Sequence, residues 1–571
     1  MKNVVVFING IPGVGKTKDI DKRLRSKPDK RKIYFPLSHK QVEEREDFLR
    51  GVKLTHWFGM KLICPLQNKK PIKTLLEINM PIRWICRICQ HLKLIPVNKC
   101  VHKIQFKKPA NVVVAPSAYL FTQHPEKYNP DLVVVDDVTM NKQDLHTRSE
   151  MERWLRELCT LGFCDYDNLK ELFKEQGERL KQYILSTIEP KLKNGIKRLL
   201  DEGSDLSKTS AKLLLKIDPV ELLDWHRLVK VYGWQEEYSI PVLMKVFELS
   251  LVESRKIIVV GAQINKRVVE MLVKDFQREY GEPIKVVYEK MELEQPKAKS
   301  VVYRVRSPKY EDAWYPTTTS INKSKTTRLS IAQRIESILL SFYKLEEFNN
   351  LHIGIVKPKN ADLDDFLTTP VKHARISSLD YGSLRGSNEL EHCEILIIIG
   401  TFVKNVEATQ KDFIKFFHRK PSTIKCEKLP GGGYVYVDQE LESYRAGGEN
   451  YEWYQAIHRA RPALEQRKIF VFGLIPEEIY REFEVRNVTF EKNGGVMCMV
   501  EWKSFEDFMR KQIGDKGISQ RDLVNVIYCE YGGNKEVIRR KIKKFVTKRD
   551  GEFVIVWKEV AGKGGLHVQR R

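Results

Sequence analysis

The chain has 571 residues, 42% of them hydrophobic and 30% charged, which is enough apolar material for several globular domains. Lys and Arg number 99 against 75 acidic residues, and the formal charge of +24 favours a polyanionic partner because each neutralised phosphate releases counterions. No apolar run reaches the roughly 20 residues that span a membrane, no signal-peptide pattern is present, and the ten cysteines do not form a disulfide framework, so we expect an intracellular protein, cytoplasmic in a prokaryote or virus.

The first apolar run predicts a buried strand, and a phosphate-loop motif follows it directly. This motif, G-x-x-x-x-G-K-[ST], begins at Gly10 and ends at Lys16 and Thr17. Gly10, Gly13 and Gly15 allow backbone N–H groups to approach phosphate oxygens. Lys16 would reach the β- and γ-phosphates of ATP, and the Thr17 hydroxyl would bind Mg²⁺.

Four cysteines follow within a short, basic stretch: Cys64, Cys86, Cys89 and Cys100. Four thiolates with one C-x-x-C pair suit either a tetrahedral zinc site or an iron–sulfur cluster, and their spacing does not decide between the two. His91 and His102 are alternative zinc ligands, and four buried thiols without a metal are a further alternative. Residues 61–108 carry eleven Lys or Arg and one acid, so this module is expected to lie against a phosphate backbone.

A second apolar run, residues 132–135, predicts the strand that carries an acid for the metal ion. It is followed by Asp136, which would hold Mg²⁺, and by Asp137, which would orient or deprotonate the attacking water. Together with the phosphate loop, these acids predict a P-loop ATPase.

Helical spacing of apolar residues predicts a helical insertion over residues 140–250. Further apolar runs predict strands at 353–356 and 395–399, and a helix is predicted over 328–345.

The C-terminal residues 506–571 read as an added module. Two helices and a hairpin, whose strands are joined by residues 562–565, predict a winged-helix-like fold. On the second helix, Arg539, Arg540 and Lys543 are expected to contact the DNA backbone. The alternative is a solvated basic terminus with a structural hairpin.

The order of these parts resembles the superfamily 2 iron–sulfur DNA helicases of the XPD/DinG type. As in that family, a four-cysteine module lies between the phosphate loop and the metal-binding acid, and Asp136-Asp137-Val138-Thr139 stands at the position of the DEAH box. The other strings that carry the resemblance are residues 32–39, 58–64, 110–120, 256–263, 380–389 and 454–462.

The resemblance implies an α/β fold with two RecA-like P-loop lobes, a four-cysteine insertion, a helical arch-like insertion and the winged-helix-like module. The expected boundaries are 1–54 with 109–139 and 251–295 for lobe 1, 55–108 for the cysteine module, 140–250 for the arch, 296–505 for lobe 2 and 506–571 for the C-terminal module. It also implies ATP and Mg²⁺ as cofactors, with a 4Fe–4S cluster on the four cysteines and zinc as the alternative.

Further site residues follow from the resemblance alone. Ser38 and His39 match an element that touches DNA. Arg385 and Gly386 match a glycine-rich loop that meets DNA and nucleotide. Arg459 or Arg461 would be the arginine finger that stabilises charge on the transferred phosphate, and the motif does not decide between them.

The sequence therefore predicts an ATP-dependent DNA helicase or translocase acting on single-stranded DNA and duplex junctions, with 5′→3′ travel implied by the resemblance. A translocase without unwinding activity is one alternative. The other is a DNA-binding ATPase switch, such as a replication initiator or regulator, because Asp137 is one methylene shorter than the family's Glu.

Overall fold

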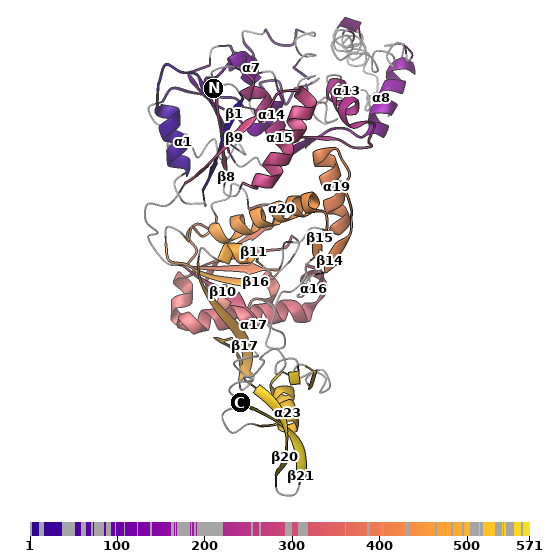
Figure 1. Ribbon diagram of the computed structural model, residues 1–571. Coiled ribbons are helices and arrows are strands. Elements are labelled where there is room, and N and C mark those ends of the chain that lie inside the picture. The colour runs from indigo at the N-terminus through magenta and orange to yellow at the C-terminus, as the bar shows by residue number, and fades with distance from the viewer. Residues whose placement is uncertain are drawn as a thin grey trace. The chain divides into compact units, whose positions relative to one another are not determined.

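The computed structural model describes residues 3–570 except for 11–15, 37–51, 59–63, 70–71, 74–84, 137–139, 161–164, 168–182, 191–220, 292–299, 307–317, 385–388, 429–433, 503–512, 514–517, 532–538, 544–552 and some shorter gaps. The described residues form two compact units, coloured along the chain in Figure 1. The first comprises residues 1–294, 404–429 and 433–451, and the second comprises residues 295–403, 430–432 and 452–571.

The first unit is built on a seven-stranded sheet in which every pairing is parallel. Its strands, in spatial order, are β3 (Leu54–His56), β4 (Val112–Val114), β2 (Lys32–Phe35), β5 (Leu132–Asp136), β8 (Lys256–Gly261), β1 (Val4–Asn9) and β9 (Lys285–Lys290). The central strands are continuous Val- and Ile-rich runs because helices and loops cover both faces of a parallel sheet. The α/β expectation for this part of the chain is confirmed.

Helices and short 3-10 turns surround this sheet. They are α1 (Lys16–Arg25), α6 (Val101–Ile104), η2 (Ser117–Phe121), α7 (His124–Tyr128), α8 (Arg148–Thr160), α13 (Glu221–Tyr232), α14 (Val242–Ser250), α15 (Lys266–Tyr280) and α19 (Val406–Phe417). Capping residues set both ends of helix α15. The Asn265 side chain caps its start by accepting from Val268 N at 3.1 Å, and Gly281 ends it in the left-handed region with φ 73°.

The second unit has its own seven-stranded sheet, parallel except for its last pair. In spatial order it contains β12 (Arg375–Asp380), β11 (His352–Lys357), β13 (Ile395–Ile399), β16 (Lys468–Phe472), β10 (Val301–Val305), β17 (Glu484–Asn493) and β18 (Val496–Glu501). Its helices and turns are α16 (Thr318–Lys323), α17 (Lys325–Phe342), η4 (Leu345–Asn350), η5 (Asp364–Phe366), α18 (Thr369–Lys372) and α21 (Glu477–Tyr480). The strands and the long helix α17 that were expected here are confirmed, and two mostly parallel sheets are what tandem RecA-like lobes require.

The region expected to be a wholly helical insertion also contains a strand pair. β6 (Lys142–Asp144) and β7 (Ser239–Pro241) pair antiparallel, so the start and the end of the region lie side by side. Helix α14, at the end of this region, is buried in the core of the first unit. The periodic apolar pattern did not reveal the strands because three-residue strands are too short to show alternation.

A segment from the second half of the sequence packs into the first unit. It comprises α19, the hairpin β14 (Cys426–Lys428) with β15 (Tyr434–Tyr436), and the part of α20 (Gln439–His458) that ends at Tyr451. Its core residues are Phe413, Phe416, Phe417, Tyr436, Leu441 and Tyr444. The Arg419 guanidinium binds both carboxylate oxygens of the buried Asp275 on α15, at 2.5 and 2.7 Å.

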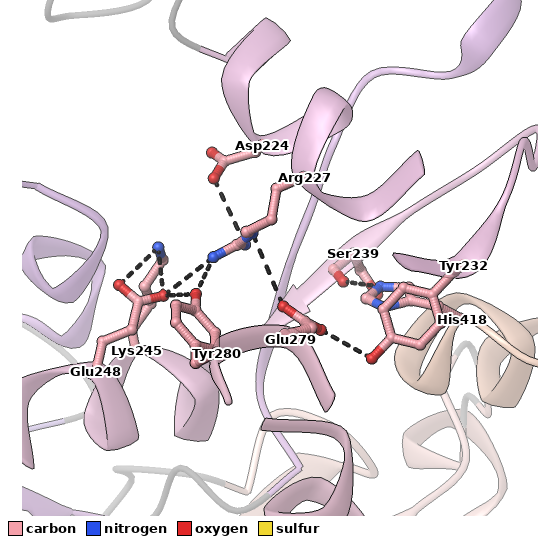
Figure 2. Close-up of polar contacts among 9 residues, drawn as sticks. All are labelled: Asp224, Arg227, Tyr232, Ser239, Lys245, Glu248, Glu279, Tyr280 and His418. Carbon is pink, nitrogen blue, oxygen red and sulfur yellow. Dashed lines mark hydrogen bonds and ion pairs between the residues drawn. The ribbon is translucent and has the colours of Figure 1, made fainter. Parts of the chain in front are cut away.

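A buried ion-pair network fastens α13 to α14 and α15 (Figure 2). Arg227 of α13 lies 3.3 Å from Glu248 of α14 and 3.8 Å from Glu279 of α15, and it also hydrogen-bonds the Tyr280 hydroxyl. Asp224, one turn earlier, lies 3.6 Å from the same guanidinium. The Glu279 side chain is only 2% exposed, so it depends on Arg227 for compensation of its charge.

The same network continues to the end of α19 (Figure 2). The Tyr232 hydroxyl donates to Glu279 at 2.9 Å, and its ring lies 4.8 Å from that of His418. His418 Nε2 lies 2.6 Å from the carbonyl oxygen of Ser239. Burial lowers the pKa of His418 to about 4, so its ring is neutral near pH 7 and donates to that carbonyl.

The C-terminal part of the second unit contains a helix and a three-stranded antiparallel sheet. The elements are β19 (Ile518–Ser519), α23 (Gln520–Tyr531), β20 (Phe553–Val560) and β21 (Lys563–Arg570). The predicted hairpin is confirmed, but its strands pair as far as Val560 and Lys563. Gly564 and Gly565 therefore lie within β21, and the expected four-residue connection at 562–565 was wrong because strand pairing continues through both glycines.

Across the residues that the structure describes, none of the helices combines the length and apolar character needed to cross a membrane.

Candidate nucleotide site and cysteine cluster

The phosphate loop and the acidic strand end at the same edge of the first sheet. Strand β8 lies between β1 and β5, with Asn9 paired to Gly261 and Asp136 paired to Val260. Because all three strands are parallel, Gly10 and Asp136 both lie at their carboxyl ends. Adjacent strands are about 4.8 Å apart, which separates the start of the loop from the acid by about 10 Å.

Helix α1 carries the end of the phosphate loop. It begins at Lys16, so the Lys-Thr pair stands at a helix N-terminus, where backbone N–H groups and the helix dipole favour a phosphate. The side chains of Lys16 and Thr17, and the whole of Gly13 and Gly15, lie outside the described residues. Gly10 is described, and its N–H donates to Gly261 O at 3.1 Å.

A buried lysine fixes the other end of α1. Lys32 on β2 is 2% exposed, and its ammonium donates to Leu24 O at 2.7 Å and to Ser26 O. The Leu24 carbonyl lies in the last turn of α1 and the Ser26 carbonyl lies just beyond it, so neither has an intrahelical donor. Burial lowers the pKa of Lys32, while the charge of Asp29 acts in the opposite direction. The helix that carries Lys16 is thus anchored to the strand next to β5.

Asp136 is held by a neighbouring strand. The hydroxyl of Tyr34 on β2 donates to Asp136 Oδ2 at 3.0 Å. Asp137 and Thr139 lie outside the described residues, so the structure places only the first acid of the predicted pair. Sequence reasoning missed both Tyr34 and Lys32, although polar side chains in a strand between two buried strands were the available signal.

The four predicted cysteine ligands affect one another electrostatically. Burial raises the pKa of Cys86 to about 12 and that of Cys89 to about 11, and it also raises that of Cys64. Cys100 contributes to the rise in each case, although Cys64 and Cys100 are 36 positions apart in the sequence.

Histidine and lysine neighbour these thiols. Cys86 Sγ lies 3.5 Å from Nδ1 of His102, and the charge of Lys103 lowers the pKa of both Cys86 and Cys89. Burial lowers the pKa of His102 to about 4, which keeps the ring neutral near pH 7.

The types of donor suit a group bound by thiolates, because this part of the chain carries four soft ligands and a neutral imidazole. Within the described ranges, no three or more His, Cys, Asp or Glu side chains are arranged so that they could hold a metal ion. The donor set fits, whereas a closed ligand arrangement is not shown.

Both candidate finger arginines lie at the turn that ends α20. Arg459 donates to Gln455, one turn earlier on the helix. Arg461 makes a 2.8 Å ion pair with Glu391, and its φ of 49° places it in the left-handed region, which is uncommon for a residue with a Cβ. A residue held in this region by its surroundings is a candidate for a functional role.

The predicted DNA contacts are only partly described. Arg539, Arg540 and Lys543 are exposed, while Ile542 between them is fully buried. The basic side chains of this segment therefore face solvent, while Ile542 packs against the apolar interior. Ser38, His39, Arg385 and Gly386 lie outside the described residues.

The chain matches no protein-family model and no curated protein. Solved helicase structures are similar to it, including S. tokodaii Xpd4, with a TM-score of 0.38, 13% identity and coverage of 84% of this chain and 92% of that one. Another is S. cerevisiae Dbp5 bound to RNA and ADP BeF3, with a TM-score of 0.34, 8% identity and coverage of 86% and 85%. A DEAD box protein from Methanococcus jannaschii has a TM-score of 0.26, 10% identity and coverage of 85% and 88%. The expected likeness to an XPD structure is thus found.

Proposed function

We propose that the protein is an ATP-dependent DNA helicase or translocase that couples ATP hydrolysis to movement on single-stranded DNA and to duplex unwinding. One observation supports the proposal: Gly10, at which the phosphate-loop motif begins, and Asp136 lie at the carboxyl edge of one parallel sheet. Ligands of open α/β sheets bind at this edge.

In this proposal each site residue has a distinct task. Lys16 and the loop glycines hold the β- and γ-phosphates of ATP, and Thr17 with Asp136 holds Mg²⁺. Asp137 positions the attacking water. The second RecA-like lobe supplies an arginine finger, Arg459 or Arg461, and its closure and opening around ATP drive movement.

The DNA partner is proposed from charge and from the predicted contact elements. A chain with formal charge +24 favours a polyanion, and a solvent-facing set of bases on a short helix suits backbone contact. The residues assigned to DNA are Ser38, His39, Arg385, Arg539, Arg540 and Lys543. Residues 55–108, 140–250 and 506–571 are proposed as the cysteine module, the arch-like insertion and the winged-helix-like module. Travel in the 5′→3′ direction remains part of the proposal.

The proposal is tested first at Lys16. Lys16→Ala is expected to lower DNA-stimulated ATP hydrolysis by about a hundredfold or more, because the positive charge that stabilises the transferred phosphate is lost. The matched control is Lys18→Ala, which removes an exposed lysine from the same helix and should leave turnover unchanged. Turnover that survives in Lys16→Ala would remove the motor assignment.

Two further assays on the unaltered protein distinguish a helicase from the two alternatives. A strand-separation assay on a forked duplex distinguishes unwinding from translocation alone. Slow ATP turnover that single-stranded DNA does not stimulate would instead favour the ATPase switch, for which the shorter Asp137 is the supporting feature.

We further propose that Cys64, Cys86, Cys89 and Cys100 bind a 4Fe–4S cluster, with zinc as the alternative. Protein purified without oxygen is expected to contain iron and sulfide. It should also absorb broadly at roughly 400 nm, as a thiolate-bound cluster does. Cys86→Ala should lose this metal, whereas Cys426→Ala, at an exposed cysteine elsewhere, should keep it. Stoichiometric zinc without iron would select the alternative, and metal-free protein would contradict both.

A further inference from the structure

Tyr34 lies on β2 between the apolar residues Ile33 and Phe35. It pairs with Val134 of β5, and Asp136 lies two residues further along that strand. Side chains alternate along a strand, so Val134 and Asp136 project from one face. Tyr34 lies on the same face, in the apolar cluster that also contains Val134, Ile20 and Leu24.

The tyrosine ring has little freedom to move. Tyr34 is 1% exposed and belongs to a buried apolar cluster with Ile20, Leu24, Val112, Val114 and Val134. A buried hydroxyl is costly unless it finds a hydrogen-bond partner. Its 3.0 Å bond to Asp136 Oδ2 supplies one, and the packed ring holds the hydroxyl at that place.

This bond fixes the orientation of the Asp136 carboxylate, because Oδ2 accepts from the Tyr34 hydroxyl. Mg²⁺ demands near-ideal octahedral geometry, so a carboxylate with a fixed orientation binds it better than one that rotates. Groups that orient a metal ligand commonly change metal affinity or activity by about 10- to 100-fold when removed.

We propose that Tyr34 is a positioning residue for the Mg²⁺ of ATP, acting through Asp136. The inference rests on the proposed function, because it requires Asp136 to be a magnesium ligand. It adds a residue that belongs to neither the phosphate loop nor the acidic motif and that lies 102 positions before Asp136.

The test is the magnesium dependence of ATP hydrolysis in Tyr34→Phe. Loss of the hydroxyl should raise the Mg²⁺ concentration for half-maximal turnover by about tenfold and leave nucleotide binding in EDTA unchanged. High Mg²⁺ should restore most of the rate. A residue with only a structural role would not produce this split.

Tyr128→Phe is the matched control. Tyr128 is also buried in the first unit, and its hydroxyl donates to Ala110 O at 2.9 Å and to Asn111 O at 2.8 Å. It approaches β2 at Lys32, near the amino ends of the strands and away from Asp136. Its loss should lower the melting temperature as much as or more than Tyr34→Phe, with an unchanged magnesium requirement.

A double variant separates action through Asp136 from any other route. In an Asp136→Ala background, Tyr34→Phe should have no further effect on magnesium dependence. Equal shifts in Tyr34→Phe and Tyr128→Phe, or no shift in Tyr34→Phe, would overturn the inference. If the unaltered protein has ATPase activity that Lys16→Ala abolishes, such a result rejects the role of Tyr34 alone. Absence of that activity rejects the proposed function itself.

Discussion

Replacing Arg227 with leucine is expected to lower the free energy of unfolding of the first unit by about 3–5 kcal/mol, because it leaves the buried Glu279 carboxylate without its cation. Glu279 is 2% exposed, so water cannot replace the guanidinium, whereas Glu248 keeps Lys245 at 2.8 Å. Burial already raises the pKa of Glu279, and the loss of Arg227 would raise it further. Denaturant unfolding followed by circular dichroism measures the change.

A surface ion pair provides the control for this prediction. Arg148 and Glu152 form a 2.7 Å pair in which both side chains are 42% exposed, so Arg148→Leu should cost far less stability than Arg227→Leu. Adding Glu279→Gln to Arg227→Leu should recover part of the lost stability, because it removes an uncompensated charge. Equal effects of Arg227→Leu and Arg148→Leu would show that the network in Figure 2 contributes little to stability.

Asp136→Asn is expected to reduce ATP turnover by about 100- to 1,000-fold while the protein remains folded. The substitution keeps the shape of the side chain and an oxygen that can accept from Tyr34, but removes the charge that would bind Mg²⁺. Nucleotide binding in EDTA should be unchanged, and steady-state hydrolysis at several Mg²⁺ concentrations measures the loss.

Asp131→Asn is the matched control, at the opposite end of the same strand. Asp131 is 40% exposed, pairs with Lys30 at 3.7 Å and accepts from the Arg31 N–H at 2.9 Å. Its substitution should leave turnover intact. Normal hydrolysis by Asp136→Asn would move the metal-binding role to a different residue.

The network of Arg227 and the bond between Tyr34 and Asp136 were both outside the reach of sequence patterns. Each depends on side chains from different elements, such as α13 with α15 or β2 with β5. In the sequence, Arg227 is one charged residue on an amphipathic helix, and this pattern is typical of a solvated face.

Local chemistry was enough to predict several strands of the two sheets. Continuous Val and Ile runs identified β1, β5 and β13, since strands buried on both faces carry apolar residues at every position. The phosphate-loop motif and the acids after β5 were recognisable because their functions depend on short spacings within one segment. The roles assigned to these residues remain predictions.

The tertiary structure alone decided which segments become neighbours. Apolar parallel strands resemble one another, so their sequences could not show that β8 lies between β1 and β5 or that residues 404–451, apart from 430–432, join the first unit. The same holds for the meeting of Tyr34 with Asp136. The sequence determined the strands and their chemical groups because those follow from local patterns. Long-range packing decided their arrangement because it depends on the combined burial of the whole chain.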